Sequence, residues 1–195
     1  MSASEFFSYI ITYIRQQSRG ISYQELLITW LIGIIIVHLI FMISSRITGK
    51  AYSWKKEIWY FLIVGYVCFG AQITLLRRAA GSRTIMYTSL DFGFSSSGIY
   101  SKQQFFYSLL NVLFFVPWGL LWGLYRCKDS VLHRMVMVTC YCFLTSFVIE
   151  ITQLLTGRGY FEVADFVTNV IGGVIGGILS CVLIFLKKVR VNERG

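Results

Sequence analysis

The stretch Ser146–Gly173, SFVIEITQLLTGRGYFEVADFVTNVIGG, begins in one apolar run and ends in another. The pattern predicts two membrane helices joined by a short polar connection. Six polar side chains stand at the edges of these runs, although the whole chain has only nine acidic residues. Polar groups are costly inside a bilayer, so this concentration indicates a function or a specific structural role. The six are Glu150, Gln153, Arg158, Glu162, Asp165 and Asn169.

The composition places this hairpin in a membrane protein. The chain has 195 residues, of which 56% are hydrophobic and 14% charged, whereas soluble domains usually carry about 25% charged residues. Five stretches approach the roughly 20 apolar residues that are needed to cross a bilayer. We therefore expect an all-α polytopic membrane protein with five transmembrane helices. The five stretches are Leu26–Ser44, Glu57–Leu76, Phe105–Tyr125, Met135–Leu155 and Val163–Leu186.

The domain organisation follows from these spans. Residues 1–24 are rich in aromatic side chains but too short to cross, so we expect an amphipathic segment that lies in the membrane interface. Residues 26–186 then form the membrane domain, and residues 187–195 form a basic tail. In the last span, two pairs of glycines four residues apart predict close approach of a neighbouring helix. These pairs are Gly172/Gly176 and Gly173/Gly177.

The distribution of Lys and Arg predicts the orientation. The net charge is +9, and the 18 basic residues lie in loops and flanks, which favours contact with lipid head groups rather than nucleic acid. With five spans, seven of them fall on the side of the N-terminus and eleven on the side of the C-terminus. Because the richer side is usually cytoplasmic, we expect the N-terminus outside and the C-terminus in the cytoplasm.

On this topology, polar side chains from four helices meet at the outer leaflet. Glu150 and Gln153 are three residues apart and Asp165 and Asn169 are four apart, so each pair shares a helix face. The short loop makes the last two helices antiparallel neighbours. Asp165 also falls in the first turns of its helix, where the helix dipole favours a carboxylate. The remaining members of the expected cluster are Arg158 in the loop, Asn111 in the third span, and Arg77 and Arg78 after the second.

Three stretches together resemble the VanZ-like family of bacterial membrane proteins. NVLFFVPWGLL (Asn111–Leu121) is similar to the family's Asn-x-x-x-Phe-x-Pro-x-Gly-x-Leu segment. The hairpin from Ile149 to Gly173 is similar to its Ile-Glu-x-x-Gln, Gly-Arg and Asp-x-x-x-Asn-x-x-Gly elements. TLLRRAAGSR (Thr74–Arg83) resembles the family's arginine-bearing stretch more weakly. The chain departs from the pattern in SLDF, where Leu-x-Pro-Phe is common, and in a reduced acidic run before the last helix.

The resemblance implies a place and a kind of function. The family's named member is associated with low-level resistance to teicoplanin, a lipid-tailed glycopeptide that binds the outer surface of Gram-positive bacteria. By resemblance, we expect a multi-pass protein of the bacterial plasma membrane. Its partner would be a membrane lipid, a lipid-linked precursor of the cell envelope, or a lipoglycopeptide antibiotic.

Three hypotheses remain open for the polar cluster. In the first, an outward-facing pocket binds such a ligand through Arg77, Arg78, Asn111, Gln153, Arg158 and Asn169. In the second, the protein is an intramembrane transferase or hydrolase, with Glu150 and Asp165 as the catalytic acid and base. In the third, the cluster only locks the hairpin. No Ser/Cys–His dyad, metal triad or phosphate-binding loop appears in the sequence, and we expect no metal and no cofactor.

Overall fold

The computed structural model describes residues 2–49, 51–81, 85–94 and 99–192. Five of its helices are long and apolar enough to cross a membrane, which confirms the predicted all-α fold. Each begins or ends a few residues beyond the predicted span, and the last continues through most of the predicted tail. The elements, in chain order, are α1 (Ala3–Ser18), α2 (Tyr23–Thr48), α3 (Trp54–Ala71), a π-helical turn η1 (Gln72–Leu76), β1 (Met86–Tyr87), α4 (Ile99–Tyr125), α5 (Val131–Thr156), β2 (Phe161–Glu162) and α6 (Val163–Asn192).

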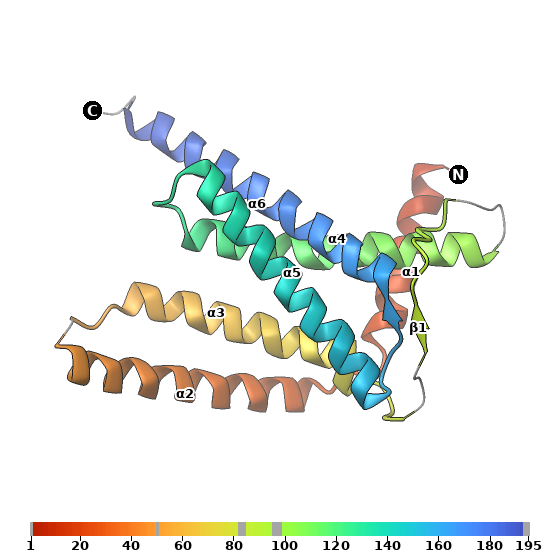
Figure 1. The fold of residues 1–195 in the computed structure, drawn as a ribbon, viewed down its shortest axis with the longest axis horizontal. Helices are drawn as coiled ribbons and strands as arrows, with labels where there is room; N and C mark the ends of the chain where they lie inside the picture. Colours follow the sequence, from red (N-terminus) through yellow and green to blue (C-terminus); the bar gives the residue numbers. More distant parts are fainter. Residues whose placement is uncertain (1, 50, 82–84, 95–98, 193–195) are drawn as a thin grey trace. The chain divides into compact units, whose positions relative to one another are not determined.

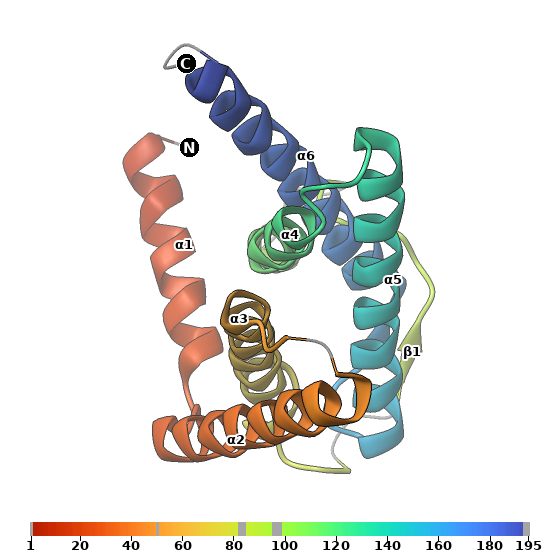
Figure 2. The same ribbon diagram turned by 90° about the vertical axis from the view of Figure 1, so that its left-hand side faces the viewer.

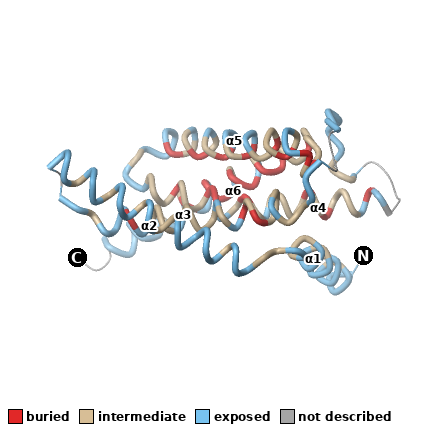
Figure 3. The backbone as a smooth tube through the Cα atoms, turned by 90° about the horizontal axis from the view of Figure 1, so that it is seen from below, coloured by how far each residue is buried: buried red, intermediate tan, exposed pale blue. Residues whose placement is uncertain are grey.

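The chain forms two compact units. One contains residues 19–79, with α2 and α3, and the other contains residues 1–18 and 80–195, with α1, α4, α5 and α6. Burial differs sharply between the helices (Figure 3): α2 has no buried residue, whereas α6 has eight. A helix such as α2, with high hydropathy and no buried side chain, exposes its apolar surface to lipid.

Two polar contacts fasten the α2–α3 hairpin. The Nδ1 atom of His38 lies 2.6 Å from Oε1 of Glu57, whose side chain is buried. The buried side chain of Gln72 donates from Nε2 to the Glu25 carboxylate at 3.4 Å. Both contacts satisfy polar groups that would be costly to leave alone in an apolar helix pair. They show His38 in the structural role that a histidine in a membrane helix most often has.

Helix α1 is started by a capping box. The backbone N–H of Ser2 donates to the Glu5 carboxylate at 2.7 Å, and the backbone N–H of Glu5 donates to Ser2 Oγ at 3.2 Å. The hydrogen bond from the Ser2 backbone holds the pKa of Glu5 below its usual value. The aromatic side chains of this helix then pack on Phe106 of α4, with the rings of Tyr9 and Tyr13 stacked on it. The segment that was expected to lie in the interface is therefore attached to α4.

The centre of the larger unit is helix α6, which lies against both α4 and α5 (Figures 1 and 2). A Cβ atom added to Gly172 or Gly176 would collide with backbone atoms of α4, at the carbonyl oxygens of Val112 and Val116 respectively. Gly177 instead faces side chains of α5. The predicted close approach is confirmed, and the two glycine pairs serve two different neighbours.

Candidate functional site

The hairpin loop after α5 is shaped by its first two residues. Gly157 adopts a left-handed conformation with φ of 62°, and its N–H donates to the carbonyl of Leu154 at 3.2 Å. The N–H of Arg158 donates to the carbonyl of Gln153 at 3.0 Å. These two bonds form a Schellman motif, the usual way for a glycine to end a helix. The motif fixes the backbone of Arg158 directly beyond the end of α5.

A segment of the loop before α4 pairs with the hairpin. Strand β1 pairs in parallel with β2, with Met86 opposite Phe161 and Tyr87 opposite Glu162. The N–H of Gly81 donates to the carbonyl of Thr156 at 3.1 Å, which attaches the same loop to the end of α5. The hairpin is therefore attached to the loop before α4 by main-chain hydrogen bonds.

Glu150 lies beneath this loop. Its side chain is on the inner face of α5 and the residue is only 2% exposed. Its Oε2 atom accepts the backbone N–H of Glu162 at 2.9 Å, from the strand that leads into α6. This hydrogen bond satisfies one oxygen of a buried carboxyl group that would be costly to leave without a partner. Glu150 thus connects the last turns of α5 to β2, which directly precedes α6.

The neighbouring amide side chains are also buried. Asn169 donates from Nδ2 to the hydroxyl of Ser146 at 2.9 Å, one turn of α5 away from Glu150. Gln153 is buried one turn beyond Glu150 on the other side. Ser146, Glu150 and Gln153 therefore form a continuous polar strip on α5, and Asn169 meets this strip from α6. Asn169 thus contacts the face of α5 that also carries Glu150, and the two polar faces meet as the spacing indicated.

Asp165 and Arg158 lie nearer the surface of the same hairpin. Both are half-buried, and Asp165 is in the first turn of α6 as expected. The position favours a carboxylate, because the N-terminal N–H groups of a helix carry partial positive charge. Within the described residues, no group of three His, Cys, Asp or Glu side chains is arranged to hold a metal ion.

Asn111 is half-buried on α4. It shares a helix face with Phe115 and Trp118, which follow it by four and seven residues. The indole Nε1 of Trp118 donates to Thr145 of α5 at 3.1 Å, so this face of α4 is turned toward α5. Asn111 therefore lies on the α5 side of α4, two turns before that contact in the direction of the hairpin loop.

Arg77 and Arg78 belong to the smaller unit. Arg77 caps η1, the π-helical turn that ends the second span. Such π turns are rare and often occur at functional positions. Both arginines are half-buried at this end of the span, where the sequence placed them. Their role as ligands for the acidic hairpin stays a prediction.

Two buried polar residues of the larger unit could not be recognised by the pattern used for the cluster. Ser146, the partner of Asn169, lies four residues before Glu150, so the helical repeat of buried polar positions could have revealed it. Arg134 was counted only as a flanking charge, but it is 3% exposed. Its guanidinium donates to the carbonyls of Arg126, Cys127 and Asp129 in the loop between α4 and α5.

The fold and the site together define a class: a polytopic helical membrane protein with a buried polar strip at the hairpin of its last two helices. The chain belongs to the VanZ-like family, because the VanZ/LLP1 family matches residues 7–185, nearly the whole chain. The resemblance that was inferred from three short stretches is thereby confirmed.

The chain was also compared with curated proteins and with solved structures. The chain is similar to caveolin-1 from Aotus nancymaae and from Plecturocebus moloch, at 38% identity over 86 residues in each case. The match covers 44% of this chain and 46% of each caveolin, so it spans less than half of either protein. No solved structure matches the chain significantly.

Proposed function

We propose that the polar strip at the α5–α6 hairpin is a ligand site that binds a membrane lipid or a lipid-linked molecule of the cell envelope. The observation that carries this proposal is the buried set of Glu150, Gln153 and Asn169 directly below a loop that presents Arg158. Interhelical hydrogen bonds in membranes average only about 0.6 kcal/mol, which is a weak reason to bury so many polar side chains for stability alone.

The chemistry of the strip fits an amphiphilic ligand. Arginine binds phosphate and pyrophosphate through a planar fork of N–H donors, and the amides of Gln153 and Asn169 offer both donors and acceptors. The helices around them expose apolar side chains along most of their length, where the hydrocarbon part of the same ligand would lie. Arg77 and Arg78 would add further cations on the same side of the membrane.

We further propose that the site faces the outside of the cell. The excess of Lys and Arg on the side of the C-terminus supports this orientation through the positive-inside rule. An outward site would meet lipid-linked precursors after their export, or a lipoglycopeptide that inserts from the medium. Membership of the VanZ-like family supports a contribution to low-level teicoplanin resistance.

The direct test is mass spectrometry of lipids that remain bound to gently purified protein. Arg158→Ala removes the guanidinium but keeps the backbone N–H that completes the Schellman motif, so the hairpin fold should survive. We expect a specific envelope lipid on the native protein and its loss from Arg158→Ala. The matched control is Lys128→Ala, which removes an exposed cation from the loop between α4 and α5. An identical, non-specific lipid mixture on all three proteins would contradict the proposal.

The same experiment separates binding from catalysis. If Glu150 and Asp165 were a catalytic acid and base, Glu150→Gln would abolish conversion of the bound lipid while leaving the lipid on the protein. If the site only binds, Arg158→Ala should reduce the amount of bound lipid more than Glu150→Gln does. A chemically altered lipid that accumulates with the native protein and not with Glu150→Gln would favour the enzyme.

A further inference from the structure

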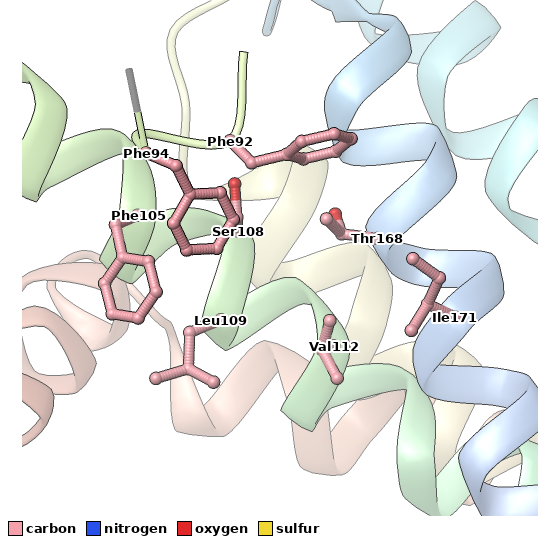
Figure 4. A pocket seen from close by; sticks show the side chains of 8 residues that line it. All are labelled: Phe92, Phe94, Phe105, Ser108, Leu109, Val112, Thr168 and Ile171. Atoms are coloured by element: carbon pink, nitrogen blue, oxygen red, sulfur yellow. The ribbon is translucent and has the colours of Figure 1, made fainter. Parts of the chain in front are cut away.

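A separate apolar cavity of about 260 Å³ lies between α4, α6 and the segment before α4 (Figure 4). Its walls are formed by Leu109 of α4 and Ile171 of α6, and two phenylalanines, Phe92 and Phe94, cover it from the preceding segment. Ile171 and Phe94 are also exposed on the surface of the protein, so the cavity adjoins the surface of the membrane helices. Its volume is below that of a site for a whole drug-sized molecule, which suits part of a larger ligand.

One polar group in this lining has an unsatisfied hydrogen bond. Ser108 is 6% exposed, and within the described residues its Oγ atom has no hydrogen-bond partner. Serine in a helix commonly bonds to the carbonyl one turn back, as Thr168 in the opposite wall does with Ala164 at 3.0 Å. Figure 4 shows the Ser108 hydroxyl directed toward the segment that carries Phe92 and Phe94. A buried hydroxyl without a partner is unfavourable, but this one is shielded by its neighbours and adds no polar surface to the cavity.

The aromatic cover is held in place by its own hydrogen bonds. The backbone N–H of Gly93 donates to the Asp91 carboxylate at 2.8 Å, and the carbonyl of Gly93 accepts the hydroxyl of Ser101 from the first turns of α4. Gln104 donates to the carbonyl of Asp91 at 3.3 Å. The cover is thus attached to α4 itself, and the cavity is part of the fold rather than a gap beside a loose loop.

We infer that this cavity holds the hydrocarbon chain of a membrane lipid. The apolar walls exclude a charged or strongly hydrated ligand. The five membrane-spanning helices place the cavity where acyl chains are the surrounding medium.

This inference rests on the proposed function and extends it. Thr168 faces the cavity, while Asn169, the next residue of α6, bonds to the polar strip of α5. One turn of α6 therefore carries the wall of the cavity and a member of the polar site on adjoining faces. A single lipid could place its head group at the hairpin and one chain in the cavity.

The test is photolabelling of the full-length protein in phosphatidylglycerol vesicles that contain the same lipid with a diazirine in one acyl chain. We expect labelled residues to concentrate in 105–112 and 168–171. Leu109→Trp, which fills the cavity, should lower this labelling roughly tenfold, the effect of excluding about two methylene groups from an apolar site. Leu113→Trp is the matched control, because Leu113 is exposed on α4 and does not line the cavity.

The outcomes distinguish the cavity from the polar site. Cavity labelling that responds to Leu109→Trp but is unchanged by Arg158→Ala would support the chain site and contradict the polar site. Lipid that is lost with Arg158→Ala, but labels all exposed spans equally in the native protein, would support the polar site and overturn the cavity. Labelling that Leu109→Trp and Leu113→Trp reduce equally would also overturn it.

Discussion

The two loops that flank α5 each have an ionisable side chain buried beside them, and they use it differently. At one end, Arg134 donates through Nε and Nη2 to three loop carbonyls, while its Nη1 lies 3.4 Å from the sulfur of Cys181. At the other end, Glu150 accepts one loop N–H and is accompanied by several more polar side chains on α5 and α6.

The two ends differ in how many polar groups accompany the buried ionisable side chain. All three nitrogens of the Arg134 guanidinium have partners, two in the carbonyls of the loop and one in Cys181 of α6, so this end is explained as a structural lock. The Glu150 end contains more polar groups than a cap requires, including Gln153, Asp165 and Asn169. The comparison therefore supports a structural role at the α4–α5 loop and agrees with the ligand site that we propose at the α5–α6 loop.

The largest effect is expected at the structural end. Arg134→Met removes the donor for three carbonyls in a buried position, and the free energy of unfolding should fall by about 3 kcal/mol. Lys128→Met in the same loop should change it by no more than about 0.5 kcal/mol, because Lys128 is exposed. Thermal unfolding in detergent measures both. If both substitutions cost the same, Arg134 is not a lock.

The next largest effect is expected for glycines of α6, the helix that packs against both α4 and α5. Gly176→Ala should cost about 2 kcal/mol, since the new methyl group meets the rigid backbone of α4. Gly177→Ala should cost less than about 1 kcal/mol, because its methyl group lies 3.2 Å from the flexible side chain of Met135. The pair is compared by the fraction of folded protein at increasing denaturant. A larger loss with Gly177→Ala would show that α5, not α4, sets the packing of α6.

At the α5–α6 end, Glu150→Gln should leave the free energy of unfolding within about 1 kcal/mol of the native value. The amide oxygen of glutamine can still accept the N–H of Glu162, so the hairpin connection survives. The measurement is again thermal unfolding in detergent. A loss comparable to that of Arg134→Met would mean that Glu150 is a second structural lock.

The smallest effect concerns the bond between Asn169 and Ser146. Removing either partner should cost about 0.6 kcal/mol, and a double-mutant cycle of Asn169→Ala with Ser146→Ala should give a coupling of similar size. A coupling several times larger would show that the polar strip contributes mainly to stability. That result would favour the hypothesis that the polar cluster only locks the hairpin.

Much of this fold could be predicted because hydropathy and helical spacing are local signals. The five spans, the hairpin and the two glycine pairs follow from them directly. The pairing of β1 with β2 gives no periodic signal, because each strand has only two residues. The cavity at Ser108 depends on which residues of three separate segments come together, and no spacing within one helix encodes that.

The site was predictable to a similar degree. Glu150, Gln153 and Asn169 are buried on facing helices, which their spacing indicated. Arg134 was not recognised, although it shares a face with Val138 and Cys142, which are fully buried at four-residue intervals after it. Lys and Arg near helix ends are usually solvated, and Arg134 is an exception to this rule.

The most direct test of the division between the two ends is stabilisation by lipid. Anything that binds only the folded protein raises its melting temperature, by about 5 °C or more at a hundredfold excess over the dissociation constant. We predict that the lipid identified on the native protein produces this shift with the native protein and with Lys128→Ala, but not with Arg158→Ala. An equal shift in all three proteins would contradict a ligand site at the α5–α6 hairpin.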